Sequence, residues 1–156
     1  MIQNDEYFMR EALKLARRAA AEDEVPVGAV IVHQGAIIAR AHNQVETLKD
    51  PSAHAEMIAI TQAASALSCK WLLDCTMYVT LEPCPMCAGA LVLARLKTLI
   101  FAAKDPKTGA CGSLLNISAH PALNHRVEIR QGLLEEESAE LLKNFFAGKR
   151  NAQGSC

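Results

Sequence analysis

Three side chains with the chemistry of metal ligands stand in two short motifs of this sequence. His54 opens His54-Ala55-Glu56, and Cys84 and Cys87 lie three residues apart in Pro83-Cys84-Pro85-Met86-Cys87. One imidazole and two thiolates are preferred ligands of zinc, and a site with three protein ligands leaves the fourth tetrahedral position open, as catalytic zinc sites do. These residues therefore predict a catalytic zinc site that holds one Zn²⁺ per subunit.

Glu56 follows the histidine by two residues, near enough to reach a water molecule at such an ion without ligating it. A carboxylate placed there can take a proton from the water and return it to a leaving group, so Glu56 is the predicted catalytic residue. At the start of a helix, Cys84 and Cys87 would present both sulfurs on one face, where the unpaired N–H groups of the helix lower the pKa of a thiol.

The combined pattern is identified as the signature of the zinc-dependent nucleobase deaminases, in which His-x-Glu is followed by Pro-Cys-x-x-Cys. The match is complete, with its residues at His54, Glu56, Pro83, Cys84 and Cys87. About 30 residues separate the two halves, which is room for a helix and a strand between them.

The elements that must position these motifs follow from hydrophobic patterning. We expect a mixture of helices and strands that runs along the whole chain: helices over 5–21, 54–67, 85–95 and 135–146, and strands over 25–33, 36–41, 76–81, 98–102 and 127–129. The strands lack polar alternation, which predicts helices on both faces of their sheet. The strand, helix and strand over 76–102 predict a parallel unit, with the cysteines beyond the carboxyl end of its first strand.

Local signals refine this pattern. Asn4 or Asp5 is the expected cap of the first helix, and Asp50-Pro51 the expected start of the second. Gln34-Gly35 fits a two-residue hairpin turn, and a short helical turn is expected over 113–117.

The length and composition of the chain limit its number of domains, its partners and its location. The 156 residues fit one domain, 1–156, with 151–156 expected to fray, and the net charge of −1 gives no sign of a nucleic-acid partner. The acidic N-terminus lacks the apolar core of a signal peptide, and no apolar run approaches the ~18 residues of a membrane span. We therefore expect a cytoplasmic protein without a membrane segment, with ordinary thiols at Cys69, Cys75, Cys111 and Cys156.

Beyond the zinc motif, the chain from about Tyr7 to Arg150 resembles the bacterial tRNA-specific adenosine deaminases, which convert the wobble adenosine of an anticodon to inosine. The resemblance rests on several further stretches: Glu24-Val25-Pro26-Val27-Gly28-Ala29, His42-Asn43, Asp50-Pro51-Ser52-Ala53, Tyr78-Val79-Thr80-Leu81-Glu82, Asp105-Pro106-Lys107-Thr108-Gly109, Gly112-Ser113-Leu114, Asn124-His125-Arg126 and Phe145-Phe146. It implies a cytidine-deaminase-like α/β fold, a three-layer α/β/α sandwich with a mixed, roughly five-stranded sheet.

The resemblance also implies roles and partners. Asn43 would contact the flipped base, the Asp105 loop would approach the neighbouring nucleotide, and the cleft would be completed in a homodimer. Asn43 on its position alone fits a turn former equally well. The implied partner is a tRNA anticodon arm, for which a local basic patch suffices. Candidate members are Lys104, Lys107, Arg126, Arg130, Lys143, Lys149 and Arg150.

Three alternatives remain open at this point. Cys84 and Cys87 alone would suit a thiol-redox pair, although such a pair needs neither His54 nor Glu56. A non-catalytic zinc-stabilised RNA-binding module would need a fourth ligand from Cys75, Cys111 or His42, of which His42 is interpreted as structural. A deaminase of a free nucleoside, nucleotide or base of the cytosine or guanine type would use the same zinc chemistry.

Overall fold

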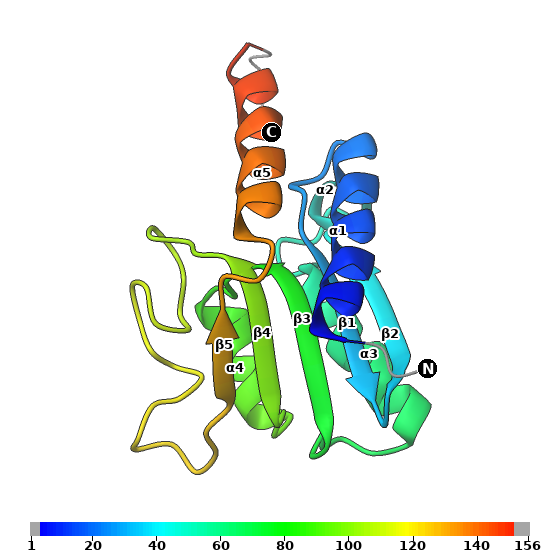
Figure 1. Cartoon of the computed structure of the whole chain (residues 1–156), viewed down its shortest axis with the longest axis vertical. Helices are drawn as coiled ribbons and strands as arrows, with labels where there is room; N and C mark the ends of the chain where they lie inside the picture. Colours follow the sequence, from blue (N-terminus) through cyan, green and yellow to red (C-terminus); the bar gives the residue numbers. More distant parts are fainter. Residues whose placement is uncertain (1–3, 152–156) are drawn as a thin grey trace.

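Apolar side chains on the central strands alternate between two faces, and different helices cover each face. The computed structural model describes residues 4–151 (Figure 1). Its helices and strands, in chain order, are α1 (Asp5–Ala21), β1 (Gly28–His33), β2 (Ala36–His42), α2 (Val45–Leu48), α3 (Ala55–Leu67), β3 (Cys75–Leu81), α4 (Pro85–Leu93), β4 (Thr98–Ala103), β5 (Glu128–Gln131) and α5 (Glu135–Asn151).

The five strands form one mixed sheet in the order β2-β1-β3-β4-β5. β1 runs antiparallel to both of its neighbours, while β3, β4 and β5 are parallel. The predicted hairpin is confirmed, because His33 pairs with Ala36 across the two-residue turn. The predicted parallel unit is also confirmed as β3, α4 and β4.

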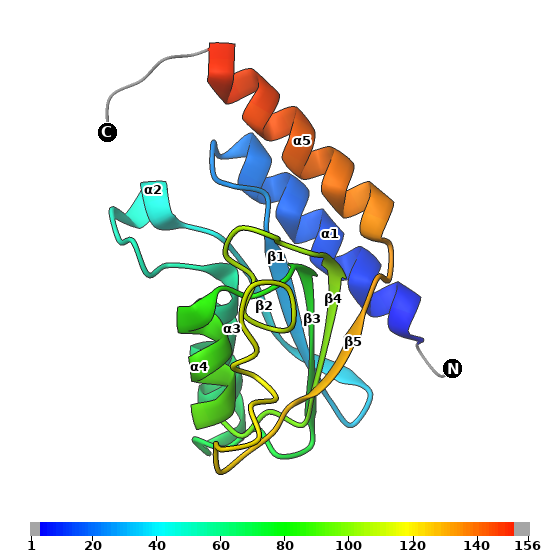
Figure 2. The ribbon, with the colours of Figure 1, turned by 90° about the vertical axis from the view of Figure 1, so that its left-hand side faces the viewer.

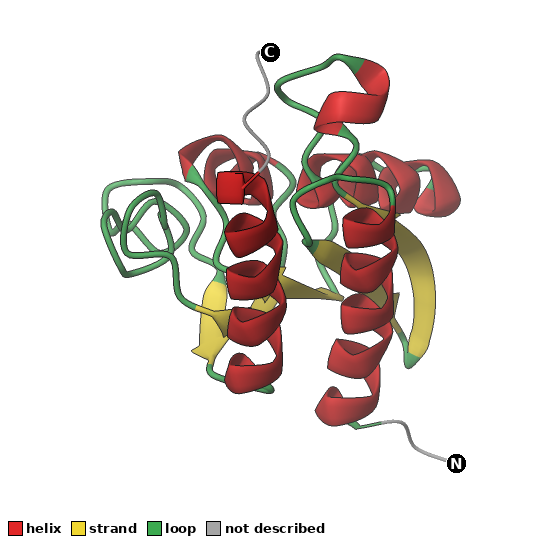
Figure 3. Cartoon of the chain, turned by 90° about the horizontal axis from the view of Figure 1, so that it is seen from above, coloured by secondary structure: helices red, strands yellow, loops and turns green. Residues whose placement is uncertain are grey.

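Two hydrophobic clusters lie on opposite faces of this sheet. Ala29 and Ile31 of β1 belong to the larger cluster with α3 and α4, while Val30 and Val32 belong to the cluster that packs on α1. Figure 2 shows α3 and α4 on one side of the sheet and α1 and α5 on the other. Seen from above, α1 and α5 lie side by side (Figure 3), and Arg10 of α1 pairs with Glu137 of α5. The expected three-layer α/β/α fold is therefore confirmed.

Helix α1 lies very close to β1. A Cβ atom on Gly28 would come within 2.1 Å of the backbone oxygen of Ala12, so only glycine fits at the start of β1. Ala12 and Ala16 are fully buried at this contact. At the other end of the helix, the side chain of Asn4 accepts a hydrogen bond from the N–H of Tyr7, which confirms the expected N-cap.

Several local predictions are wrong. Helix α3 begins at Ala55 with His54 as its N-cap, while Asp50 accepts hydrogen bonds from Ser52 in a separate turn. The helical turn expected over 113–117 is absent, because the chain there folds back in an isolated bridge between Cys111 and Asn116.

The ends of some elements also differ from the expectation. The short helix α2 was not predicted, and α5 continues past 146 to Asn151. The rest of the expected tail, 152–156, lies outside the described residues, as does Cys156. Among the helices of residues 4–151, none is both long enough and apolar enough to cross a membrane.

Candidate active site

The N-termini of α3 and α4 meet at one edge of the sheet and bring the three predicted ligands together. His54 is the N-cap of α3, Cys84 is the N-cap of α4, and Cys87 lies in the first turn of α4. Nδ1 of His54 is 3.5 Å from Sγ of Cys84 and 3.5 Å from Sγ of Cys87. The three candidate ligand atoms all lie within 4.8 Å of one another.

These distances fit a tetrahedral metal ion. Zinc–sulfur bonds of about 2.3 Å and a zinc–nitrogen bond of about 2.05 Å at a tetrahedral angle place the nitrogen about 3.6 Å from each sulfur. The observed 3.5 Å separations agree with that value. One nitrogen and two sulfurs are also the donor types that zinc prefers. The three side chains therefore fit a zinc ion bound between them.

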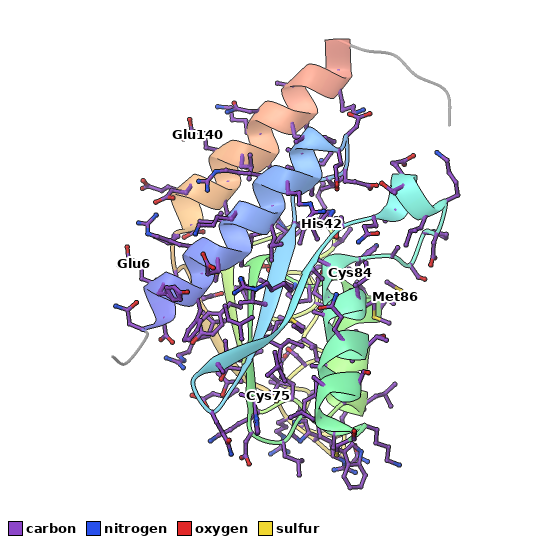
Figure 4. The ribbon with its side chains drawn as sticks, turned by 90° about the vertical axis from the view of Figure 1, so that its right-hand side faces the viewer. Glu6, His42, Cys75, Cys84, Met86 and Glu140 are labelled. Atoms are coloured by element: carbon purple, nitrogen blue, oxygen red, sulfur yellow. The ribbon has the colours of Figure 1, made fainter. Side chains whose placement is uncertain are left out.

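A fourth protein ligand is missing from this group among residues 4–151. His42, one candidate, instead places Nε2 2.5 Å from a carboxylate oxygen of Glu22. Cys75 lies at the other end of the sheet from Cys84 (Figure 4), and Cys111 is outside the group. Burial raises the pKa of both thiols, to about 12 for Cys111. The arrangement is that of an open site.

Glu56 lies in the first turn of α3 and is almost completely buried. Burial raises the pKa of its carboxyl to about 7, against smaller lowerings by its own backbone N–H and by the nearby His54. Hydrogen bonds from Cys87 and His54 hold the pKa of Cys84 down at about 4. The floor of the site thus combines a sulfur that readily becomes a thiolate with a carboxyl group that is able to carry a proton.

A pocket of about 1050 Å³ opens above this floor. His54, Glu56 and Cys84 line its base, and α2, the loop at Asp105 and the far end of α5 form its sides. Its volume is at the upper end of the roughly 300–1,000 Å³ of small-molecule sites, so it holds more than a single base. Phe145, Phe146 and Lys149 of α5 reach it, although only Lys149 was considered from the sequence as a contact to substrate.

Asn43 lies at the end of β2, buried beside His54 in the pocket wall. Its side-chain oxygen accepts a hydrogen bond from the N–H of Ala55 at 2.8 Å, which ties β2 to the start of α3. The same bond fixes which way the amide group faces. No group of residues 4–151 accepts a hydrogen bond from its nitrogen, which is therefore free to donate to a ligand.

Asp105 also lines the pocket, but its carboxylate is engaged within its own loop. It accepts hydrogen bonds from the N–H groups of Lys107 and Thr108 and from the hydroxyl of Thr108. Asp105 therefore shapes the loop. A contact with a neighbouring nucleotide stays a prediction.

Two buried carboxylates at the site were missed by sequence reasoning. Glu24 is 1% exposed and Glu82 is 2% exposed, and both border the pocket. Each is a charged residue at the edge of an otherwise apolar segment, Glu24 before Val25-Pro26 and Glu82 before Pro83. A charged residue next to an apolar segment could have indicated a buried carboxylate. Such a group needs hydrogen-bond donors from other parts of the chain.

Three of the basic residues expected to form a patch have partners within the protein. Lys149 reaches the pocket and forms an ion pair with Asp23. Arg130 pairs with Asp5 at the start of α1, and Arg126 donates to the backbone oxygen of Pro121.

Comparison with known proteins gives concordant results. Residues 3–150 match the MafB19-like deaminase family. The chain is 55% identical to the tRNA-specific adenosine deaminase of Aquifex aeolicus, over 94% of this chain and 96% of that protein.

Two solved structures have the same fold. A structure from a study of deaminases that edit adenosine to inosine at the wobble position of transfer RNA is similar with a TM-score of 0.84 and 46% identity, covering 87% of this chain and 99% of that one. The guanine deaminase of Nitrosomonas europaea is similar with a TM-score of 0.81 and 25% identity, covering 94% of this chain and 87% of that one.

Proposed function

The chain belongs to the MafB19-like deaminase family and groups with the tRNA-specific adenosine deaminases, and we propose that it converts adenosine to inosine at the wobble position of a tRNA anticodon. The overall reaction adds one water to adenosine and releases ammonia. The resemblance to tRNA-specific adenosine deaminases that the sequence predicted is confirmed by these matches. The deaminase chemistry follows from membership of the family.

One observation carries the proposal for the site. The imidazole of His54 lies at the tetrahedral separation from the sulfurs of both Cys84 and Cys87, and all three atoms lie within 4.8 Å of one another, on the floor of a pocket next to a buried carboxylate. A structural zinc site would have a fourth protein ligand, and a redox pair would not need the imidazole between its sulfurs. An open three-ligand site beside an acid is the arrangement that zinc-assisted hydrolysis uses.

We assign the three ligands to Zn²⁺, one per subunit. Bound there, the ion would supply the Lewis acidity that makes a water molecule nucleophilic at neutral pH. Glu56 takes the proton that this water loses and delivers it to N1 of adenine as C6 is attacked. Its carboxyl then carries the proton that remains on the hydroxyl added at C6 to the amino group, so that the C6–N bond breaks and ammonia leaves.

Asn43 and the side walls hold the base for this attack. The amide of Asn43 is oriented by the N–H of Ala55, so its nitrogen can donate to an acceptor on the flipped base. Phe145 and Phe146 offer ring faces and edges at the pocket, and bases stack on such side chains in single-stranded RNA. The loop that begins at Asp105 approaches the nucleotide next to the flipped base, and Asp105 holds the shape of this loop.

The substrate is a tRNA anticodon arm, and the active unit is a homodimer acting in the cytoplasm. The outer helix α4 supports the dimer, because Leu93 is 80% exposed and Met86 is 38% exposed on it. Both are large apolar side chains, and their spacing of seven residues puts them on one face of the helix, where exposed apolar groups that form a patch mark an interaction site. Figure 4 shows Met86 close to Cys84, so a partner on this face would lie beside the site.

The direct test is to incubate the protein with an anticodon stem-loop carrying a wobble adenosine, and separately with free adenosine, cytosine and guanine. We expect inosine in the stem-loop and negligible turnover of the free compounds. Efficient deamination of guanine or cytosine, with an unchanged stem-loop, would instead support a deaminase of free bases, whose zinc chemistry would be the same.

A further inference from the structure

We propose that Glu82 is the positioning residue of the loop that runs from Asp105 to Ser113, and that it holds this wall of the pocket in place for the substrate. Glu82 directly follows β3 and is 2% exposed. The loop that surrounds its carboxylate starts more than twenty residues later in the chain.

The carboxylate of Glu82 accepts four hydrogen bonds, all from this loop. Oε1 accepts from the N–H of Asp105 at 3.1 Å and from the hydroxyl of Ser113. Oε2 accepts from the N–H of Cys111 at 3.0 Å and from the N–H of Ser113 at 3.0 Å. A carboxylate has about four lone-pair sites, so the loop satisfies all of them.

The loop wraps tightly around the carboxylate. A Cβ atom on Gly109 would lie 2.4 Å from Cδ of Glu82 and 2.5 Å from the backbone oxygen of Asp105. Any side chain at Gly109 would therefore push the loop away from Glu82. The backbone adds two further ties, from Ala110 to the oxygen of Pro83 and from Glu82 to the oxygen of Ala103.

This arrangement couples two parts of the site. Glu82 stands two residues before Cys84, so the strand end that presents a ligand also carries the anchor of the Asp105 loop. Because the loop and not the metal group surrounds the carboxylate, we expect Glu82 to govern how well substrate is held and to leave the chemical step nearly unchanged.

Glu24 provides a matched case elsewhere in the lining of the same pocket. Its carboxylate is 1% exposed and accepts hydrogen bonds from the N–H groups of Glu46 and Thr47 and from the hydroxyl of Thr47. It thereby anchors α2 in the way that Glu82 anchors the loop. The same chemical change at each carboxylate should loosen only the segment that it holds.

The test uses Glu82→Gln and Glu24→Gln in the full chain. Glutamine keeps the size of the side chain, but its NH₂ group faces N–H donors and breaks two of the four bonds at Glu82. In hydrogen exchange followed by mass spectrometry, Glu82→Gln should speed exchange in peptides covering 104–115 roughly tenfold and leave 45–50 at the wild-type rate. Glu24→Gln should show the reverse, and peptides from α1 should be unchanged in both.

The kinetic arm rests on the proposed function and measures deamination of the anticodon stem-loop. Glu82→Gln should raise KM about tenfold with kcat within about threefold of wild type and zinc retained. A fall in kcat at unchanged KM, or loss of zinc, would show that Glu82 acts on the metal segment and would overturn the proposal.

The exchange arm does not depend on which substrate is used, so inactivity of the wild type toward RNA would refute the proposed function alone. If Glu82→Gln fails to fold, Ser113→Ala removes one of the four donors and should give a smaller acceleration in the same 104–115 peptides. Wild-type exchange over 104–115 in whichever variant folds would refute the role of Glu82.

Discussion

The floor of the pocket and its rim are built in different ways. The floor consists of His54, Glu56, Cys84 and Cys87, at the first turns of two helices that pack on the larger core cluster. The rim consists of α2, the loop over 105–113, and Phe145, Phe146 and Lys149 of α5.

The backbone itself fixes the floor, whereas the rim depends on a few polar anchors. A helix start dictates where its first side chains point, and α3 and α4 both pack their inner faces on the core beneath the sheet. The two rim segments next to Glu24 and Glu82 are surface segments tied to single buried carboxylates. The difference indicates that the chemistry sits on rigid elements while substrate contacts sit on adjustable ones. Changes to the floor should therefore lower kcat, and changes to the rim should raise KM.

The largest effect is expected from Glu56→Ala on the floor. Loss of the proton carrier should lower kcat by roughly 10²–10⁴-fold with zinc content and fold retained. Single-turnover deamination of the stem-loop measures this. Glu140→Ala is a suitable control, because Glu140 is an exposed carboxylate on α5 (Figure 4). Retained turnover in Glu56→Ala would remove Glu56 from the mechanism.

The next largest effect is expected from Phe146→Ala on the rim. Stacking of a base on an aromatic ring contributes about 1–3 kcal/mol, so KM should rise roughly 5- to 100-fold while kcat changes little. Steady-state kinetics over a range of stem-loop concentrations gives both constants. A drop in kcat as large as that of Glu56→Ala would contradict the claim that rim residues act on substrate binding and floor residues on the chemical step.

A smaller, pH-dependent effect is expected from Glu24→Gln. Burial alone would raise the pKa of Glu24, but hydrogen bonds from Thr47 and the N–H of Glu46 outweigh it and lower the pKa. A lowered pKa contributes stability above the ordinary carboxyl pKa, and this stability is lost as the pH falls through the native value. The variant should be about 1–3 kcal/mol less stable at neutral pH.

That difference should shrink toward acid pH, because the wild-type carboxylate then takes up a proton. Urea unfolding from neutral pH down to about pH 3 checks it, because the contribution is lost only below the ordinary carboxyl pKa of about 4.3. A difference that grows toward acid pH would mean that Glu24 is not the charged anchor of α2.

The smallest effect is expected from Lys149→Ala. Lys149 and Asp23 form an ion pair at 2.6 Å, but the two side chains are 43% and 75% exposed. Exposed pairs contribute about 0–1 kcal/mol, so the free energy of unfolding should change by less than that. If Lys149→Ala binds the stem-loop more weakly and with a smaller salt dependence, Lys149 contacts a phosphate of the RNA. A loss of stability above about 2 kcal/mol would show that α5 is held by this pair.

Much of the floor could be predicted from the sequence. The ligand types and spacings, the parallel unit that delivers Cys84, and the apolar strands covered on both faces are all local patterns. They determine where helices and strands start, and therefore where side chains at those starts point. Even here the start of α3 was placed wrongly, because Asn43, twelve residues away, binds the N–H of Ala55.

Most of the rim could not be predicted. The hydrogen bonds of Glu82 come from a loop that lies more than twenty residues later in the chain. Helix α5 follows the last strand of the sheet, and its contact with the pocket joins residues far apart in the sequence. The Cys111–Asn116 bridge replaced an expected helical turn because the loop folds back around Glu82. Contacts of this kind depend on tertiary packing, which no local pattern specifies.

The most direct test of the account is the metal content of the freshly purified protein and of two variants. We predict about one zinc per chain in the wild type and in Glu56→Ala, and none in His54→Ala. Wild-type protein that is free of zinc and still deaminates RNA, or full zinc in His54→Ala, would contradict the claim that these three side chains form one metal site.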